Sequence, residues 1–309
     1  MVEGLVDIII VNWNSGSLLK ECICSALPST HSNYRIHIID NNSEDGSSYN
    51  LPTDPRITVH SMQENLGFGN ACNAALKFCN GQYILLLNPD TLIKNHTIQK
   101  AVQFAENNTG CIVYGCAQED EFGKLQKFTV GRFPNLITFC NDILGLSYLN
   151  PRLFKNGFLC TDWEYSKSDY VQHVMGSFYL IKASWIHAHG FFDDRYFVYL
   201  EDIDLSHRIL QSGGKIFYDR DNLICHKQGG ISKKVKAKRL FYSLHAKHEF
   251  IKKHFSWPAF IVADSIMIVP GFFARIIHAI LVEKSYRILM ESIKGYGLFY
   301  KHLFIKKIL

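Results

Sequence analysis

The nine cysteines of this 309-residue chain form no Cys-x-x-Cys pair and no spacing typical of a zinc site. Their number is odd, so free thiols in a reducing cytoplasm are the simplest interpretation. Low-complexity tracts and internal repeats are also missing, which excludes repeat architectures and disfavours extended disorder. The first residues lack the positive segment of a signal peptide, since Glu3 and Asp7 precede a short apolar run. A globular protein with a substantial core is therefore expected.

A long uninterrupted apolar run is also lacking near the carboxyl end. Residues 257–282 are strongly apolar, but Asp264, Pro270 and Arg275 interrupt them, and the run between Asp264 and Arg275 is far shorter than the ~20 residues of a spanning helix. Helices lying in the membrane interface, with lysines toward lipid headgroups, fit this pattern. Packing of the same residues against the main domain is the alternative.

The chain has only a small excess of positive charge, with a net charge of +5. Its basic residues, however, are clustered. One cluster lies in the middle of the second half and another closes the chain: Lys233, Lys234, Lys236, Lys238 and Arg239, then Lys301, Lys306 and Lys307. Such clusters suit nucleic acid or an anionic membrane. No recognition helix or RNA-binding signature accompanies them, so the partner expected is a membrane surface and not nucleic acid.

A continuous apolar run at residues 83–87 stops at the polar corner Asn88-Pro89-Asp90. Its length suits a central parallel strand covered on both faces. Pro89 cannot donate to a sheet ladder, so the strand ends there and delivers Asp90. Ligands of open α/β sheets bind at the carboxyl ends of strands. A plain strand-to-helix turn is the alternative for this stretch taken alone.

The first half of the chain alternates strands and helices. Strands are expected at residues 6–13, 35–40, 57–60 and 83–87. This rhythm predicts an α/β fold with a mainly parallel sheet and helices on both faces. Asn14 or Ser15 is expected to cap the first helix, and Asn95 the helix that ends near residue 107. Asp40 is a second carboxylate at the carboxyl end of a strand.

The segment Gly67-Phe68-Gly69-Asn70 superficially resembles a dinucleotide-binding fingerprint. Cys72 stands at the third glycine position and the motif does not follow the first strand, so a dehydrogenase is discounted. The glycines can still bring backbone amides at a helix N-terminus close to a phosphate. A simple glycine turn is the alternative.

The second half contains an aromatic-rich stretch, residues 132–168, that is expected to be a loop or insertion around a binding cleft. After it, Gly176-Ser177 interrupts an apolar strand, which permits the close approach of a ligand or another backbone. His226 lies where a later strand ends, although a single histidine is more often structural than a ligand.

An acidic triplet, Glu201, Asp202 and Asp204, begins a helix among aromatic residues. The helix macrodipole alone favours acidic residues at this position. Aromatic walls, however, would also raise the proton affinity of a carboxylate and prepare a general base. Both interpretations stay open on these residues alone.

Seven motifs together resemble the inverting family 2 glycosyltransferases of the GT-A fold, and within them the bacterial rhamnosyltransferase branch that extends polyprenyl-diphosphate-linked glycans. They occur in family order over about residues 5 to 255: residues 8–15, Ile39-Asp40-Asn41-Asn42-Ser43, Asn65-Leu66-Gly67-Phe68-Gly69-Asn70, Leu87-Asn88-Pro89-Asp90, Gly176-Ser177, residues 199–205, and residues 226–232.

The resemblance implies a donor site at the strand ends. Asp40 would hydrogen-bond the pyrimidine of a dTDP- or UDP-sugar, and the remaining donor-binding positions would be Asn12, Asn42, Asn65, Gly67, Asn70, Asn88 and Asp90. Asp90 matches the last acidic position of an Asp-x-Asp metal motif, whose first position here is the neutral Asn88. His226 matches the histidine that completes a site for Mg²⁺ or Mn²⁺.

The resemblance also implies the chemistry. Asp202 matches the general base of a Glu-Asp pair, Glu201 and Asp204 would orient it, and Gly176, Ser177 and Asp204 would lie on the acceptor side. A divalent cation would neutralise the leaving diphosphate. A positioned carboxylate contributes typically ~10²–10⁴-fold to deprotonating an acceptor hydroxyl. One base without a protein nucleophile means inversion at the sugar.

Residues 1–235 are accordingly expected to form a GT-A domain, with a nucleotide-sugar half (1–116) and an acceptor half (117–235), and residues 236–309 a helical, membrane-associated region. The expected activity is transfer of L-rhamnose from dTDP-rhamnose to a polyprenyl-diphosphate-linked glycan on the cytoplasmic face of the plasma membrane, in O-antigen or cell-wall polysaccharide synthesis.

Other functions stay open. The chain could transfer another hexose or an N-acetylhexosamine from a UDP-sugar. A nucleotide-sugar pyrophosphorylase is disfavoured because such enzymes carry a basic glycine-rich loop after the first strand, whereas residues 12–16 are uncharged. A non-catalytic membrane-binding module is disfavoured because both Asp90 and Asp202 are present.

Overall fold

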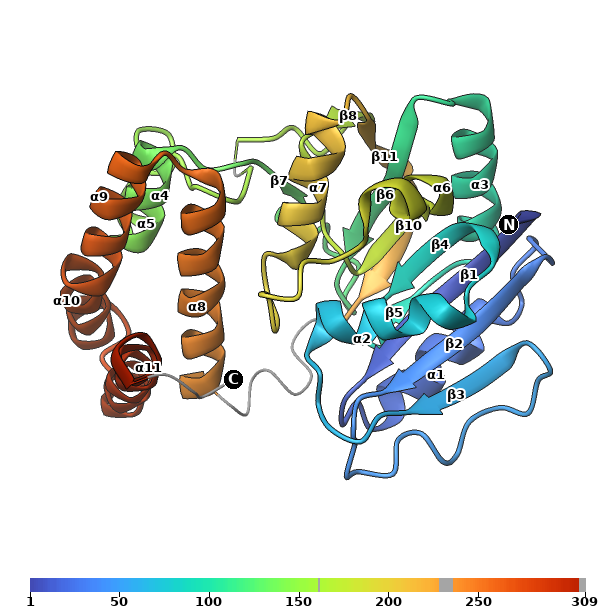
Figure 1. Ribbon diagram of the computed structural model, residues 1–309, viewed down its shortest axis with the longest axis horizontal. Helices are drawn as coiled ribbons and strands as arrows, with labels where there is room; N and C mark the ends of the chain where they lie inside the picture. The colour runs from blue at the N-terminus through green and yellow to red at the C-terminus, as the bar shows by residue number, and fades with distance from the viewer. Residues whose placement is uncertain (161, 228–235, 306–309) are drawn as a thin grey trace. The chain divides into compact units, whose positions relative to one another are not determined.

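The computed structural model describes residues 1–160, 162–227 and 236–305 (Figure 1). Two compact units account for the chain. The first comprises Met1–Gly131, Trp163–Asp194 and Asp202–Gly230, and the second comprises Arg132–Asp162, Arg195–Glu201 and Ile231–Leu309. Two internal segments thus group with the C-terminal helices, and the domain division at residue 235 stays a prediction.

The first unit is built on a nine-stranded sheet of order β3-β2-β1-β4-β10-β6-β11-β5, with β8 paired to β11. Its strands are β1 (Val2–Asn12), β2 (Tyr34–Asp40), β3 (Ile57–Ser61), β4 (Gly81–Leu87), β5 (Thr91–Leu92), β6 (Cys111–Glu119), β8 (Asp169–Val171), β10 (Phe178–Lys182) and β11 (Lys215–His226). β1, β2, β3 and β4 run parallel, whereas β10 lies antiparallel between β4 and β6. The predicted α/β class is confirmed.

Helices cover both faces of this sheet, as predicted. Ile8 and Ile10 of β1 join a core with α1 (Ser17–Ala26) and α3 (Thr97–Asn107). Successive strand residues face opposite sides, so Ile9 faces the other layer, where α2 (Phe68–Ala75) packs on β1 and β2, and α6 (Ala183–His189) packs on β4. The short helix η1 (Leu76–Phe78) follows α2, and α7 (Glu201–Gln211) precedes β11.

Both predicted helix caps were wrong. α1 begins after Gly16, whose φ is 57°, and α3 begins after His96; neither helix has a side-chain cap. Asn14 instead adopts a φ of 51°, and its Oδ1 accepts the N–H of Glu44 at 2.7 Å. The side-chain amide of Asn14 therefore binds the loop after β2 and does not cap α1.

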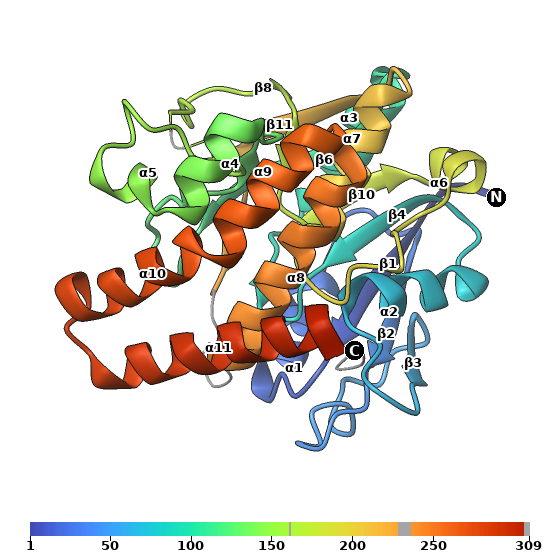
Figure 2. The same cartoon turned by 60° about the vertical axis from the view of Figure 1, so that its left-hand side comes forward.

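The second unit is helical. It contains α4 (Leu136–Ile143), α5 (Leu146–Leu149), α8 (Lys236–His254), α9 (Trp257–Ile268), α10 (Pro270–Ile277), the π-helical turn η3 (His278–Val282) and α11 (Tyr286–Ile305). α11 returns past α10 and packs on α8 (Figure 2). The prediction of a loop at residues 132–168 was wrong for α4 and α5. Asn135 and Thr138 form a capping box at the start of α4, which the aromatic pattern of this stretch did not indicate.

The apolar stretch Trp257–Val282 continues through α9, α10 and η3 as one helical path. Pro270 occupies the start of α10, where proline is tolerated, so it does not break the path as the sequence suggested. Among the residues described, this stretch is long and apolar enough to cross a membrane. Its most apolar 18 residues have a mean hydropathy of 2.0, and only 17% of that part is buried. Trp257, Phe273 and Leu281 are exposed.

Candidate active site

The carboxyl ends of β1 and β2 place Asn12 beside Asp40, in register across the parallel pair. Both side chains are buried. Nδ2 of Asn12 donates to Oδ1 of Asp40 at 3.0 Å, and the Ser48 hydroxyl donates to Oδ2 at 2.9 Å, so the carboxylate is held at both oxygens. Within the described residues, Oδ1 of Asn12 accepts no hydrogen bond although it is buried. Asn42 is exposed in the following turn, at a φ of 61°.

Asn41 connects this edge to the glycine loop, and the sequence reasoning assigned it no role. Its Nδ2 donates to Oδ1 of Asn65 at 2.8 Å and to the carbonyl of Gly67 at 2.9 Å, while its Oδ1 accepts the N–H of Leu66 at 2.8 Å. Gly67 has a φ of 79° and precedes α2. The structure thus brings Asn65 and Gly67 to the end of β2. The position of Asn41, a polar residue directly after a buried strand, could have indicated this role from the sequence.

Asn70 and Asn73 of α2 hold the segment that leads toward α7. Nδ2 of Asn70 donates to the carbonyl of Asp194 at 3.4 Å. The amide of Asn73 forms two hydrogen bonds to the backbone of Phe192, at 2.9 and 3.0 Å. Asn73 is a second residue that the sequence reasoning missed, and the contact of Asn70 in this structure is to the protein backbone.

Asp90 and His226 meet where β4 and β11 end. Oδ1 of Asp90 lies 3.2 Å from Nε2 of His226, and the N–H of Lys227 donates to the carbonyl of Asp90 at 3.0 Å. Nδ1 of His226 lies 3.0 Å from Oε1 of Gln118. An amide oxygen only accepts, so Nδ1 carries a proton, and Nε2 is the ring nitrogen that faces the Asp90 carboxylate.

This donor set fits a divalent cation. Metal–oxygen bonds of ~2.1 Å at right angles place neighbouring ligand atoms ~3 Å apart, which matches the separation between Asp90 and His226. Histidine ligands commonly donate their other N–H to a second partner, as His226 does to Gln118. Gln118 lies far from both residues in sequence and was also missed.

Asp202, at the start of α7, is held by Gly176. The N–H of Gly176 donates to Oδ2 of Asp202 at 3.1 Å, and the N–H of Ile203 donates to Oδ1 at 2.9 Å. The next residue, Ser177, accepts the N–H of Asn88 on its carbonyl at 3.1 Å. The close approach predicted at Gly176-Ser177 is therefore made by protein groups, and these two residues connect Asp202 with the turn that carries Asp90.

The other two acidic residues of the triplet are buried. Oδ2 of Asp204 accepts from Nε of Arg208 at 3.0 Å, and Arg208 also donates to backbone carbonyls between residues 189 and 191. This environment favours the orienting role of Asp204 over direct contact with an acceptor. Before Glu201, two non-glycine residues have positive φ, Tyr199 (74°) and Leu200 (64°), a strained backbone of the kind found near functional sites.

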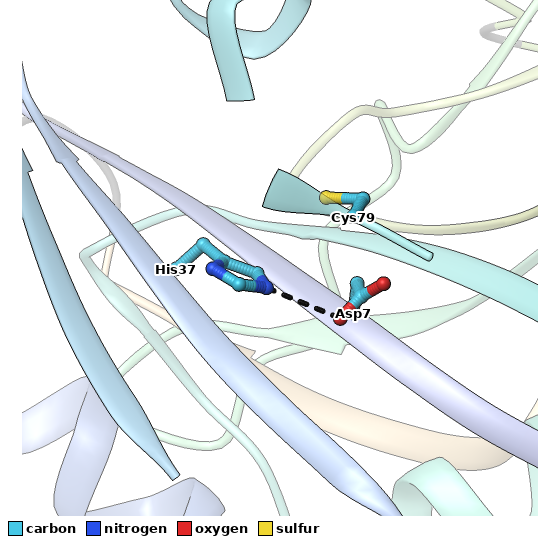
Figure 3. A group of neighbouring side chains, drawn as sticks. All are labelled: Asp7, His37 and Cys79. Carbon is cyan, nitrogen blue, oxygen red and sulfur yellow. Dashed lines mark hydrogen bonds and ion pairs between the residues drawn. The ribbon is translucent and has the colours of Figure 1, made fainter. Parts of the chain in front are cut away.

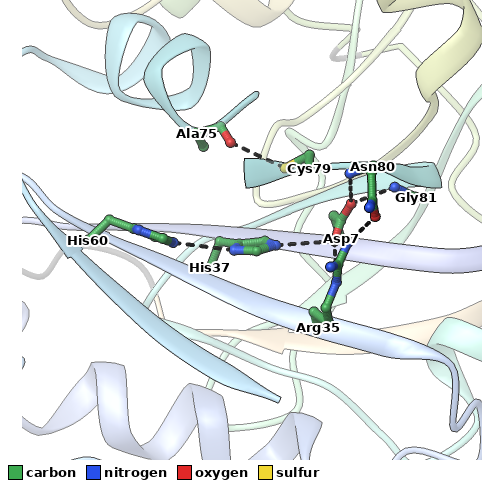
Figure 4. A network of polar contacts seen from close by, with 8 residues as sticks. All are labelled: Asp7, Arg35, His37, His60, Ala75, Cys79, Asn80 and Gly81. Atoms are coloured by element: carbon green, nitrogen blue, oxygen red, sulfur yellow. Dashed lines mark hydrogen bonds and ion pairs between the residues drawn. The ribbon is translucent and has the colours of Figure 1, made fainter. Parts of the chain in front are cut away.

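A separate polar cluster surrounds Asp7, five residues before Asn12 and thus ~16 Å away along the strand. Asp7, His37 and Cys79 present ligand atoms within 4.8 Å of one another (Figure 3). Asp7 already accepts hydrogen bonds from Arg35, His37 and the N–H groups of Asn80 and Gly81 (Figure 4). Burial raises the pKa of Cys79 to about 12, so its thiol keeps its proton. We interpret this cluster as a structural anchor.

The fold and the site define an α/β protein whose polar residues collect at the carboxyl ends of parallel strands, where nucleotides bind in such sheets. Residues 7–160 match the family model Glycosyl transferase family 2. The chain is 23% identical over 233 residues to glycosyltransferase GlyG of Streptococcus pneumoniae serotype 4, covering 74% of this chain and 72% of GlyG. It is 27% identical over 201 residues to rhamnosyltransferase WbbL of Escherichia coli K12, and the match covers 62% of this chain and 66% of WbbL. The chain belongs to the family 2 glycosyltransferases.

A solved structure supports the GT-A fold. Mannosyltransferase PcManGT of Pyrobaculum calidifontis, in complex with GDP-Man and Mn²⁺, superposes with a TM-score of 0.57 at 13% identity, covering 98% of this chain and 88% of that one. At this identity the likeness concerns the fold alone. The predicted fold and enzyme class are confirmed.

Proposed function

We propose that this glycosyltransferase moves a sugar from a pyrimidine nucleotide donor to a glycan hydroxyl with inversion, with Asp202 as the general base. The observation that carries the proposal is the pair of contacts at Gly176 and Ser177. Gly176 holds Asp202, and Ser177 holds the Asn88 turn that bears Asp90. Because Gly176 and Ser177 are consecutive, these two contacts fix the position of the base relative to the leaving-group site. An in-line displacement requires such a fixed arrangement.

We propose that Asp90 and His226 hold Mg²⁺ or Mn²⁺. A bound cation would neutralise charge on the leaving diphosphate. Asn88 supplies a neutral oxygen at best, so the site carries less negative charge than one with two carboxylates. The Mn²⁺ in PcManGT supports a metal in a protein of this fold.

We propose dTDP-L-rhamnose as the donor, supported by the name of WbbL. Asp40 would accept the pyrimidine N–H, because Asn12 and Ser48 hold its carboxylate in one orientation. Asn42, Asn65, Gly67 and Asn70 would complete the donor side. A UDP-hexose or UDP-N-acetylhexosamine offers the same pyrimidine N–H and is the competing donor class.

We propose a polyprenyl-diphosphate-linked glycan as the acceptor, reached at the cytoplasmic face of the plasma membrane in cell-surface polysaccharide synthesis. The exposed apolar side chains of α9, α10 and η3 support this location. Residues 236–305 also contain eleven lysines and arginines against four acidic residues, which suits anionic lipid. Although the stretch 257–282 is long enough to cross a membrane, it contains the charged residues Asp264 and Arg275, so we propose that the enzyme is peripheral, with its helices in the interface.

A thermal-shift panel of dTDP- and UDP-sugars, each with and without Mn²⁺, tests the donor and the metal together. A ligand that binds the native state raises the melting temperature. We expect the largest shift with dTDP-rhamnose and Mn²⁺, and a smaller Mn²⁺-dependent shift in Asp90→Ala. A larger shift with a UDP-sugar would show that the donor is a UDP-sugar and not dTDP-rhamnose. The absence of any shift would contradict nucleotide-sugar binding.

A further inference from the structure

A buried chain of polar side chains lies behind Asp202. Nε2 of His173, in β9 (His173–Val174), is 3.7 Å from Oδ2 of Asp202. Nδ1 of His173 lies 2.9 Å from the hydroxyl of Ser206, and this hydroxyl lies 3.0 Å from the hydroxyl of Tyr179. Ser206 and Tyr179 are fully buried and His173 is 5% exposed. The chain therefore leads from the core of the first unit to Asp202.

The positions of these residues give the contact a defined geometry. Ser206 follows Asp202 by four residues on α7, so the two side chains share one helix face. His173 precedes Gly176 by three residues. One short segment thus approaches Oδ2 of Asp202 twice, through the ring of His173 and the backbone N–H of Gly176.

The protons of the chain can be assigned from its chemistry. Burial lowers the pKa of His173, although the charge of Asp202 opposes the change, and burial raises the pKa of Tyr179. A neutral imidazole carries one N–H. If Nδ1 carried it, the Nε2 lone pair would face a carboxylate. The favourable arrangement has Tyr179 donating to Ser206, Ser206 donating to Nδ1, and the Nε2–H facing Asp202.

We propose that His173 is a positioning residue for the general base. Its Nε2–H, kept in this tautomer by Ser206 and Tyr179, holds the Asp202 carboxylate in the rotamer that meets the acceptor hydroxyl. The inference rests on the proposed function, because it takes Asp202 as the base. Transfer is sensitive to such positioning, since a displacement of ~1 Å can cost ~10²-fold in rate.

The test compares two variants of similar size in the full-length chain. His173→Met removes the N–H, whereas His173→Gln keeps a side-chain N–H near the position of Nε2. We expect His173→Met to lower single-turnover transfer at saturating donor by ~10-fold or more, with nucleotide affinity unchanged, and His173→Gln to restore most of the rate. Equal losses in both variants, in proportion to lost melting temperature and donor affinity, would indicate a merely structural role and overturn the proposal.

A double-mutant cycle with Asp202→Asn separates the inference from the proposed function. If His173 acts through Asp202, His173→Met has no further effect once Asp202→Asn is present. Near wild-type transfer by Asp202→Asn would overturn the proposed base itself. An inactive Asp202→Asn together with a fully active His173→Met would overturn only the inference.

Smaller deletions keep the proposal testable should His173→Met fail to fold. Tyr179→Phe and Ser206→Ala each remove one hydroxyl from the chain and leave the ring of His173 in place. We expect both variants to lose transfer several-fold with unchanged donor affinity, the larger loss occurring in Ser206→Ala. Wild-type rates in both variants would overturn the proposal.

Discussion

Gly176 and Asp202 are in contact through a backbone N–H and a carboxylate oxygen, and position 176 has little room for a side chain. A methyl group at position 176 would lie 3.2 Å from Oδ2 of Asp202, closer than most such contacts. We predict that Gly176→Ala displaces the carboxylate by a few tenths of an ångström and lowers transfer by ~10-fold, with little change in donor affinity. Single-turnover rates and nucleotide titrations check both parts.

A matched control for this variant is Gly110→Ala in the same unit, because a methyl group there would meet nothing within 4 Å. Gly110→Ala should retain the wild-type rate. A wild-type rate in Gly176→Ala as well would show that the contact with Asp202 has no role in positioning.

Gln118 offers a test of the proposed metal site that leaves both ligands in place. Gln118→Leu removes the acceptor for the Nδ1–H of His226, so the ring loses its fixed orientation and tautomer. Loss of such a second partner typically weakens metal binding ~10–100-fold. We predict a rise of this size in the Mn²⁺ concentration that gives half-maximal nucleotide binding.

The control for Gln118→Leu is Gln103→Leu on the exposed side of α3, which should match the wild type. Isothermal titration of Mn²⁺ at saturating nucleotide measures the difference. An unchanged Mn²⁺ requirement in Gln118→Leu would remove His226 from the proposed metal site.

The Asp7 cluster predicts a stability that depends on pH. Burial raises the pKa of Asp7, but the hydrogen bonds from His37 and Gly81 and the charge of Arg35 outweigh it and lower the pKa below 3.8. A carboxyl with a lowered folded-state pKa stabilises the fold above its unfolded pKa, and this contribution is lost as pH falls through the folded value. Asp7→Asn should cost roughly 1–3 kcal/mol at pH 7, because buried donors lose their acceptor.

Urea unfolding of wild type and Asp7→Asn at several pH values measures this effect. The difference in unfolding free energy should be constant near neutral pH and shrink below pH 3.8. The exposed Glu3→Gln serves as the control and should show a small difference throughout. An Asp7→Asn variant as stable as the wild type at pH 7 would contradict the anchoring role.

The proposed membrane attachment would rest on the apolar side chains of α10, of which Phe273 is 58% and Ile277 54% exposed. We predict that Phe273→Glu combined with Ile277→Glu abolishes sedimentation of the full-length protein with vesicles rich in phosphatidylglycerol. The melting-temperature shift with nucleotide should be unaffected, because the substitutions lie in the second unit.

Phe122→Glu is the control, since Phe122 is 86% exposed in the first unit. Its sedimentation should match that of the wild type and decrease with added salt. Equal sedimentation of the α10 variant, or a wild-type protein that ignores vesicles at low salt, would mean that this face does not contact lipid.

The strands that carry Asp40, Asp90 and His226 could be predicted because apolar runs ending at polar corners mark the ends of buried strands. The sheet class followed from the alternation of strands with helices. Hydrophobic periodicity indicates which residues of a strand are buried, and these three side chains lie at the points where the apolar runs end.

The residues that hold those side chains could not be predicted, because their partners are distant in sequence. Gln118 contacts His226 across 108 positions, and His173 reaches Ser206 across 33. The wrong helix cap has the same cause, since Asn14 bonds a residue 30 positions away. No local pattern identifies which distant backbone or ring will satisfy a polar side chain.

The central claim is that Asp202 removes the proton of the acceptor hydroxyl. Asp202→Asn keeps the shape of the side chain and removes the basic oxygen, so it should leave donor binding nearly unchanged and reduce transfer by orders of magnitude. Glu201→Gln and Asp204→Asn should be milder if these residues only orient. The measurement is single-turnover transfer at saturating donor for all three variants. A near wild-type rate in Asp202→Asn, with Glu201→Gln or Asp204→Asn inactive, would contradict the assignment of the base.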